Sequence, residues 1–150
     1  MDDFEKSLNH VLVDTFNLIL KYEESSIKKI TDVPITITEA HMIEMIGAKD
    51  NEETTVSEIS SSLHISMPTV TVAVKKLESK GLITKAPCLM DGRKAIIRLT
   101  DSGKKIERAH RLFHMRMVKN ISRQLPDAEK ETLFRAVTKL SDFFKEKIEL

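Results

Sequence analysis

Apolar residues recur at three- and four-residue steps through the first 29 residues, the spacing of one face of an α-helix. Pro34 disfavours helical backbone at Val33, so we expect residues 30–37 to interrupt the pattern. The sequence therefore predicts one long amphipathic helix over residues 3–29. Its apolar stripe is Phe4, Leu8, Val11, Thr15, Leu18, Ile19 and Tyr22.

The C-terminal third shows the same helical spacing twice more. Residues 100–124 predict a helix with Ile106, Ala109, Phe113, Met117 and Ile121 on one face. Pro126 then opens a last helix, which has a near-heptad apolar stripe. That stripe is Leu133, Val137, Leu140, Phe144 and Ile148.

Between these long helices the pattern predicts three shorter ones. We expect Thr38 to cap the first, which would end at Gly47. Thr55 and Glu58 form a capping box for a short helix to about Leu63. After a brief turn at 64–65, Ser66 caps a third helix, which would run over 66–80 and stop at Gly81.

The hydrophobic period then changes from helix to strand. Residues 82–86 and 94–99 are short β-prone runs, and they bracket an Asp91-Gly92 pair that favours a hairpin. The order of short helix, turn, longer helix and hairpin is that of a winged helix-turn-helix. We therefore predict a mainly α fold with a small β-hairpin wing. Residues 37–103 would form the DNA-binding domain, and residues 1–36 and 104–150 a helical dimerisation layer.

Composition and charge narrow the class of protein. With 41% hydrophobic residues the chain can bury a core, and its net charge is +1. Residues 1–63 hold 5 basic and 13 acidic side chains, whereas residues 64–98 hold 7 basic and 2 acidic ones. This basic block indicates a confined phosphate-binding face, although a solvated charged surface would look the same.

Cysteine usage and hydropathy favour a cytoplasmic protein without a membrane span. The single cysteine, Cys88, excludes an intrachain disulfide, and we interpret it as an inert thiol. We find no nucleophile elbow, no phosphate-cradling glycine loop and no acid–base pair on a rigid element. The sequence therefore predicts a protein that is not an enzyme and that needs no cofactor.

The helix over 66–80 has two distinct faces. Val70, Val74 and Leu77 are spaced i, i+4 and i+7, as a buried stripe would be. The opposite face carries hydroxyls near its N-terminal turn and lysines further along, which suit base edges and phosphates respectively. That face presents Thr69, Thr71, Val72, Lys75 and Lys76.

Several segments together resemble the MarR family of regulators. They are residues 66–71, 77–83, 91–93 and 97–103, which are similar to that family's recognition helix, wing and following helix start. The resemblance covers nearly the whole chain and implies a homodimer that binds double-stranded DNA. Residues 39–47 and 110–118 further resemble the streptococcal-type repressors of fatty-acid synthesis. That subgroup implies a palindromic operator and long-chain acyl groups on acyl carrier protein as corepressor.

The resemblance also assigns roles in DNA binding. It places Arg93 at the wing tip, where an arginine suits a narrow A/T-rich minor groove. Asp91 would either hold the Arg93 guanidinium in place or form the first half of a tight turn. Val72 stands where the family commonly has arginine. Its apolar side chain could contact thymine methyls, so we expect the operator to be A/T-rich. Alternatively, Val72 only packs on its neighbours. The full set of expected DNA-binding residues is Ser66, Pro68, Thr69, Thr71, Val72, Lys75, Lys76, Lys85, Asp91, Arg93 and Lys94.

The remaining candidates concern an effector and a dimer. Glu107, His110 and His114 share one helix face, and His41 could lie near them in the fold. Such a set could bind zinc. We expect instead that the histidines belong to the core or to an effector pocket, and that no metal is bound. The expected effector pocket is His41, Met42, Met45, His110, Phe113, His114 and Met117. The expected dimer interface is Phe4, Leu8, Val11, Leu133, Val137, Leu140 and Phe144.

Two other functions remain open on the sequence alone. One is a MarR-type regulator that small phenolic or aromatic ligands release from DNA. The other is a winged-helix module that binds protein, which predicts partner binding that is insensitive to salt and no binding of duplex DNA.

Overall fold

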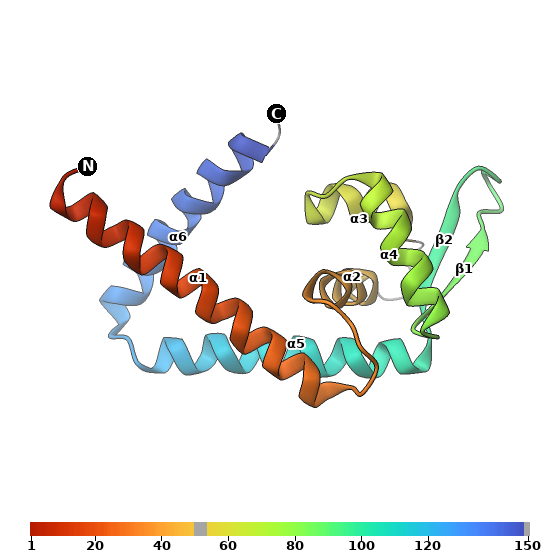
Figure 1. Cartoon of the computed structure of the whole chain (residues 1–150), viewed down its shortest axis with the longest axis horizontal. Coiled ribbons are helices and arrows are strands. Elements are labelled where there is room, and N and C mark those ends of the chain that lie inside the picture. The colour runs from red at the N-terminus through yellow and green to blue at the C-terminus, as the bar shows by residue number, and fades with distance from the viewer. Residues whose placement is uncertain (50–53, 149–150) are drawn as a thin grey trace. The chain divides into compact units, whose positions relative to one another are not determined.

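The computed structural model describes residues 1–49 and 54–148, and Figure 1 labels their helices and strands. The predicted mainly α fold with one β-hairpin is confirmed. The elements are α1 (Asp3–Ile30), α2 (Ile37–Ala48), α3 (Val56–Leu63), α4 (Met67–Ser79), β1 (Ile83–Pro87), β2 (Ala95–Leu99), α5 (Asp101–Arg123) and α6 (Asp127–Ile148). None of the described helices combines the length and hydropathy that a membrane span requires.

By compactness the chain divides into two units, Met1–Arg111 and Leu112–Leu150, and the division falls within α5. The first unit holds α1 and the winged domain because α1 contacts α2. The second unit holds the end of α5 and all of α6, none of whose described residues is buried. The boundaries predicted at 36/37 and 103/104 separate a DNA-binding domain from a dimerisation region. Compactness does not test such a functional division, so these boundaries stay a prediction.

Capping side chains set where the helices of the winged domain begin. The box predicted for α3 is confirmed: Thr55 Oγ1 accepts from the Glu58 backbone N–H, and the Glu58 carboxylate accepts from the Thr55 backbone N–H. Ser66 caps α4, as predicted. The prediction that Thr38 caps the second helix is wrong. Thr36 does so, because Glu39 three residues later completes a capping box that Thr38 could not form.

Glu58 also pairs with Lys49 across 2.8 Å, which links the end of α2 to the start of α3. The hydrogen bond from Lys49, followed by that from the Thr55 backbone, lowers the pKa of the Glu58 carboxyl below its ordinary value. Its contribution to stability is therefore present above that ordinary value and is lost as the pH falls through the lowered pKa.

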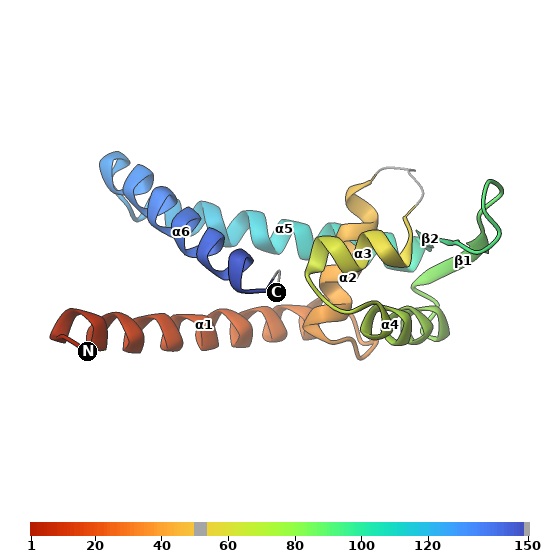
Figure 2. The same cartoon turned by 90° about the horizontal axis from the view of Figure 1, so that it is seen from above.

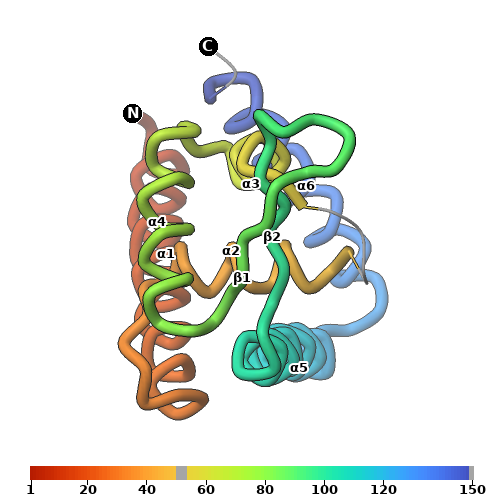
Figure 3. The backbone as a smooth tube through the Cα atoms, turned by 90° about the vertical axis from the view of Figure 1, so that its right-hand side faces the viewer, coloured from red at the N-terminus to blue at the C-terminus, as the bar shows by residue number. Residues whose placement is uncertain are grey.

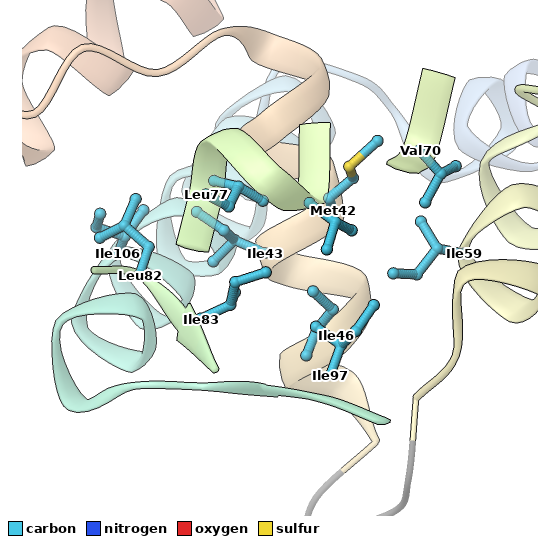
Figure 4. Packing of buried hydrophobic residues seen from close by; sticks show 11 residues of the cluster. Met42, Ile43, Ile46, Ile59, Val70, Leu77, Leu82, Ile83, Ile97 and Ile106 are labelled. Atoms are coloured by element: carbon cyan, nitrogen blue, oxygen red, sulfur yellow. The ribbon is translucent and has the colours of Figure 1, made fainter. Parts of the chain in front are cut away.

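The hydrophobic core of the first unit lies where α2, α3, α4, the hairpin and the start of α5 meet (Figure 4). Met42, Ile43 and Ile59 are fully buried in it. The stripe predicted for α4 is confirmed, since Val70 and Leu77 are fully buried and Val74 nearly so. Full burial of one such side chain contributes about 1.5–3 kcal/mol, so this packing fixes which face of α4 points outward.

The antiparallel hairpin pairs Ile83 with Leu99 at one end and Pro87 with Ala95 at the other. Each strand begins one residue later than the sequence predicted. The first does so because Leu82 still belongs to the exit of α4, where its N–H donates to the Leu77 carbonyl at 3.0 Å. That exit needs the left-handed backbone of Gly81, at φ +71°, as predicted.

Gly103 lies in the first turn of α5, directly against the backbone of Leu82, which precedes β1. A Cβ added there would lie 2.1 Å from the Leu82 carbonyl oxygen, whereas one added at Gly47 would meet the flexible Glu107 side chain at 2.5 Å. We expect Gly103→Ala to lower the free energy of unfolding by about 1–3 kcal/mol, because backbone must move. Gly47→Ala is the matched control, with a smaller loss expected. Urea unfolding of both variants measures this, and equal losses would contradict the backbone clash.

Candidate nucleic-acid interface

The outward face of α4 gathers the side chains that the sequence assigned to DNA. Because Val70, Val74 and Leu77 fix the opposite face in the core, this face is held as one surface. All seven predicted DNA-binding residues of this helix and its cap are exposed. They are Ser66, Pro68, Thr69, Thr71, Val72, Lys75 and Lys76.

Local hydrogen bonds decide what the hydroxyls at the N-terminal turn of α4 can offer. Ser66 Oγ lies 2.7 Å from Thr69 Oγ1 and accepts from the Thr69 backbone N–H at 3.3 Å. Thr71 Oγ1 donates its hydrogen to the Met67 carbonyl at 2.9 Å. Thr71 therefore offers lone pairs, which suit an exocyclic amino group of a base rather than a phosphate oxygen.

Val72 presents an apolar contact in the middle of this face. Its side chain is 54% exposed, so packing on its neighbours does not cover it. A valine cannot donate to guanine, but its methyls can contact the methyl of thymine.

The hairpin extends beside α4, and the turn between its strands projects away from the helices of the same unit (Figures 1 and 2). Lys85, Arg93 and Lys94 are exposed on it. The Asp91 carboxylate accepts from the Arg93 backbone N–H at 3.1 Å, and the Asp91 carbonyl accepts from the Lys94 N–H at 2.9 Å. Asp91 therefore shapes the turn through contacts with the backbone of Arg93 and Lys94. Of the two roles expected for Asp91, these contacts support that of a turn residue.

One cation of the basic block is committed elsewhere. Lys80 Nζ lies 2.9 and 2.8 Å from the two carboxylate oxygens of buried Glu39, in α2. Lys80 therefore joins the end of α4 to α2 and does not extend the cationic face. The spacing of Thr36 and Glu39 indicates a capping box from the sequence alone, but the sequence does not reveal that Glu39 also contacts Lys80.

The structure rearranges the histidine set proposed from the sequence. His41 and His110 do meet, with ring centroids 5.7 Å apart, but Glu107 instead pairs with Arg111 at 2.9 Å. The carboxylate between the two histidines is that of Glu23 in α1, which the sequence analysis missed. Helical spacing could not reveal it, because Glu23 lies outside the helix that carries His110.

The expected effector residues are divided between the two units. Met42 and His110 are fully buried, and Met42 packs in the hydrophobic core. Phe113, His114 and Met117 belong to the second unit. The first unit also has a cavity of about 750 Å³ with a largely cationic lining. This lining includes Lys49, Arg98, Lys104, Arg108 and Arg111. The effector pocket therefore stays a prediction.

Comparisons with known proteins agree with this geometry. Residues 35–95 match the model of the MarR family. A solved structure of Streptococcus pneumoniae FabT in complex with DNA is 30% identical, with a TM-score of 0.88, over 95% of this chain and 98% of that one. Staphylococcus aureus MepR bound to ethidium bromide is 25% identical, with a TM-score of 0.60, over 90% and 95%.

A curated relative, the uncharacterized HTH-type transcriptional regulator YhjH of Bacillus subtilis, is 28% identical over 82 residues. The match covers 55% of this chain but less than half, 46%, of that relative. The family match covers the winged domain, and the likeness to FabT covers nearly all of both chains. The chain belongs to the MarR family and is a DNA-binding transcriptional regulator.

Proposed function

We propose that this protein represses fatty-acid biosynthesis genes in the cytoplasm, as a homodimer on a palindromic, A/T-rich operator. The observation that carries the proposal is the exposed face of α4 beside the wing, which unites hydroxyls, Val72 and lysines on one surface. A helix of this kind fits the major groove, and an arginine at a wing tip fits the minor groove. The likeness to FabT in complex with DNA supports the same use of this surface.

Unpartnered apolar stripes support the homodimer. In the first unit, Phe4 is 72% and Val11 59% exposed on α1. In the second unit, Val137 is 52% and Phe144 46% exposed on α6. Exposed apolar side chains that recur along one helix favour an interaction site, and a second copy of the chain would cover them. The two winged domains would then reach successive major grooves, one helical turn apart.

We further propose long-chain acyl groups on acyl carrier protein as the corepressor. A ligand shifts an equilibrium only through unequal affinity for two arrangements, so a corepressor must favour the spacing of recognition helices that fits the operator. The sequence resemblance to fatty-acid repressors and the likeness to FabT support this choice. Met45, which packs half-buried against the core of the first unit, would contribute an adaptable apolar side chain to an acyl site.

The test begins with selection of bound duplexes from a random pool, because the recovered half-site spacing reports the dimer geometry. Fluorescence anisotropy then compares operator affinity with and without long-chain acyl carrier protein. We expect tightening of roughly 5- to 150-fold, the usual range for coupling between two sites. The carrier protein without an acyl chain is the control. Unchanged affinity would reject the acyl signal and leave the DNA-binding function standing.

A second candidate signal is a small aromatic ligand that releases the protein from DNA. The structural likeness to MepR bound to ethidium bromide favours it. The same anisotropy assay distinguishes the two signals, since an aromatic inducer weakens operator binding where a corepressor strengthens it. Binding to a protein partner that is insensitive to salt, with no duplex selected at all, would instead favour the interaction module.

A further inference from the structure

Three side chains from three helices of the first unit converge on one point. The Glu23 Oε1 atom, in α1, lies 2.6 Å from His41 Nε2, in α2, and 2.9 Å from His110 Nε2, in α5. The ligand atoms of these three residues all lie within 4.8 Å of one another. Glu23 and His110 are buried, at 3% and 0% exposure. Figures 1 and 3 show the three helices that supply them, which otherwise belong to distant parts of the sequence.

The contacts of the two His110 ring nitrogens favour a metal ion between His110 Nε2 and the Glu23 carboxylate. Its Nδ1 lies 2.7 Å from Glu44 Oε2, while its Nε2 faces Glu23. A neutral imidazole has one N–H, so it can donate to only one of these two carboxylates. A metal ion bound by the Nε2 lone pair and by the Glu23 carboxylate would satisfy both groups at this contact. Donation of Nδ1–H to Glu44 would fix the tautomer in which Nε2 can act as a ligand.

From this geometry we propose that Glu23, His41 and His110 bind a divalent transition-metal ion, Zn²⁺ in the first place. Imidazole nitrogen and carboxylate oxygen are the donors that zinc accepts, at about 2.0–2.2 Å. The Glu44 carboxylate orients His110 from behind, as outer carboxylates commonly do for metal-bound histidines. These three ligands would leave the fourth position of a tetrahedral set to a water molecule.

Only small shifts separate the described geometry from a zinc site. Tetrahedral ligands at these bond lengths lie about 3.3 Å apart. The two Nε2–Oε1 separations of 2.6 and 2.9 Å are hydrogen-bond distances, so each pair must open by less than 1 Å. The ion would place positive charge beside the buried carboxylate of Glu23.

The site would tie the long α1 helix to α2 and α5 within the first unit. None of its residues belongs to the face of α4 or to the wing, so zinc binding can be measured separately from DNA binding. The zinc set considered from the sequence alone included Glu107, which the structure replaces with Glu23.

Zinc titration of metal-free protein against a chromophoric chelator tests the proposal. We expect one equivalent per chain, and substitution by Co²⁺ should give the visible absorption bands of a tetrahedral site. Glu23→Gln and His41→Gln should each weaken zinc binding at least 100-fold, and Glu44→Gln should weaken it roughly 10- to 100-fold. His10→Gln, at an exposed histidine of α1, is the matched control and should bind as the parent does.

His41 is the decisive position because its side chain is 41% exposed, so its substitution spares the fold. Circular dichroism of each metal-free variant checks that the fold is retained. Less than one equivalent of zinc in the parent, or parent-like affinity in folded His41→Gln, would overturn the site.

Discussion

Replacing Lys75 and Arg93 together by alanine should reduce affinity for the selected duplex by roughly 10²–10³-fold at about 0.1 M salt. Both side chains are exposed, one on the outward face of α4 and the other at the turn of the wing. Lys75 is expected to neutralise a phosphate, and Arg93 to enter the minor groove. Neither contributes to the hydrophobic core, so the variant should fold as the parent does.

Salt dependence separates these contacts from a general loss of positive charge. Each phosphate contact that is removed should flatten the log–log dependence of affinity on salt by about 0.9. Lys21→Ala with Arg116→Ala removes the same two charges from exposed positions outside the winged domain, and should bind within about twofold of the parent. If the Lys75–Arg93 variant holds duplex as tightly as the parent, the assigned interface is wrong.

Local sequence signals predicted the elements of the winged domain well. The stripe at Val70, Val74 and Leu77 gave the orientation of α4 because helical periodicity depends only on neighbours along the chain. Gly81 marked the end of that helix for an equally local reason, its left-handed backbone. The cap of α2 was misplaced from Thr36 to Thr38 because both threonines are good caps, and only the spacing to Glu39 distinguishes them.

Contacts between distant residues could not be predicted in the same way. Lys80 meets Glu39 across 41 residues, and His110 meets Glu23 across 87. Neither pair follows from a period, since each depends on how whole helices pack. The same holds for Gly103, whose close approach to the Leu82 carbonyl is invisible until the hairpin and α5 are placed together. Sequence patterns therefore predicted which face of α4 is exposed, while the buried polar contacts required the structure.

Leu77→Ala should lower the free energy of unfolding by about 2–5 kcal/mol, the range for a buried leucine whose removal leaves a cavity. Leu77 is fully buried and belongs to the core shared with α2 and the hairpin. The loss is expected to be large because this side chain anchors the C-terminal half of α4, where Lys75 and Lys76 emerge on the other side.

Lys76→Ala is the matched control for Leu77→Ala, since the two residues are adjacent in α4 but Leu77 is buried and Lys76 is exposed. We expect it to change the free energy of unfolding by less than about 0.5 kcal/mol, as substitutions of exposed residues usually do. It should nevertheless weaken duplex binding, because a phosphate contact is lost. Urea unfolding and anisotropy on both variants measure the two effects. A Leu77→Ala protein as stable as Lys76→Ala would mean that α4 is not held by this face, and the orientation of its DNA-binding face would then have no physical basis.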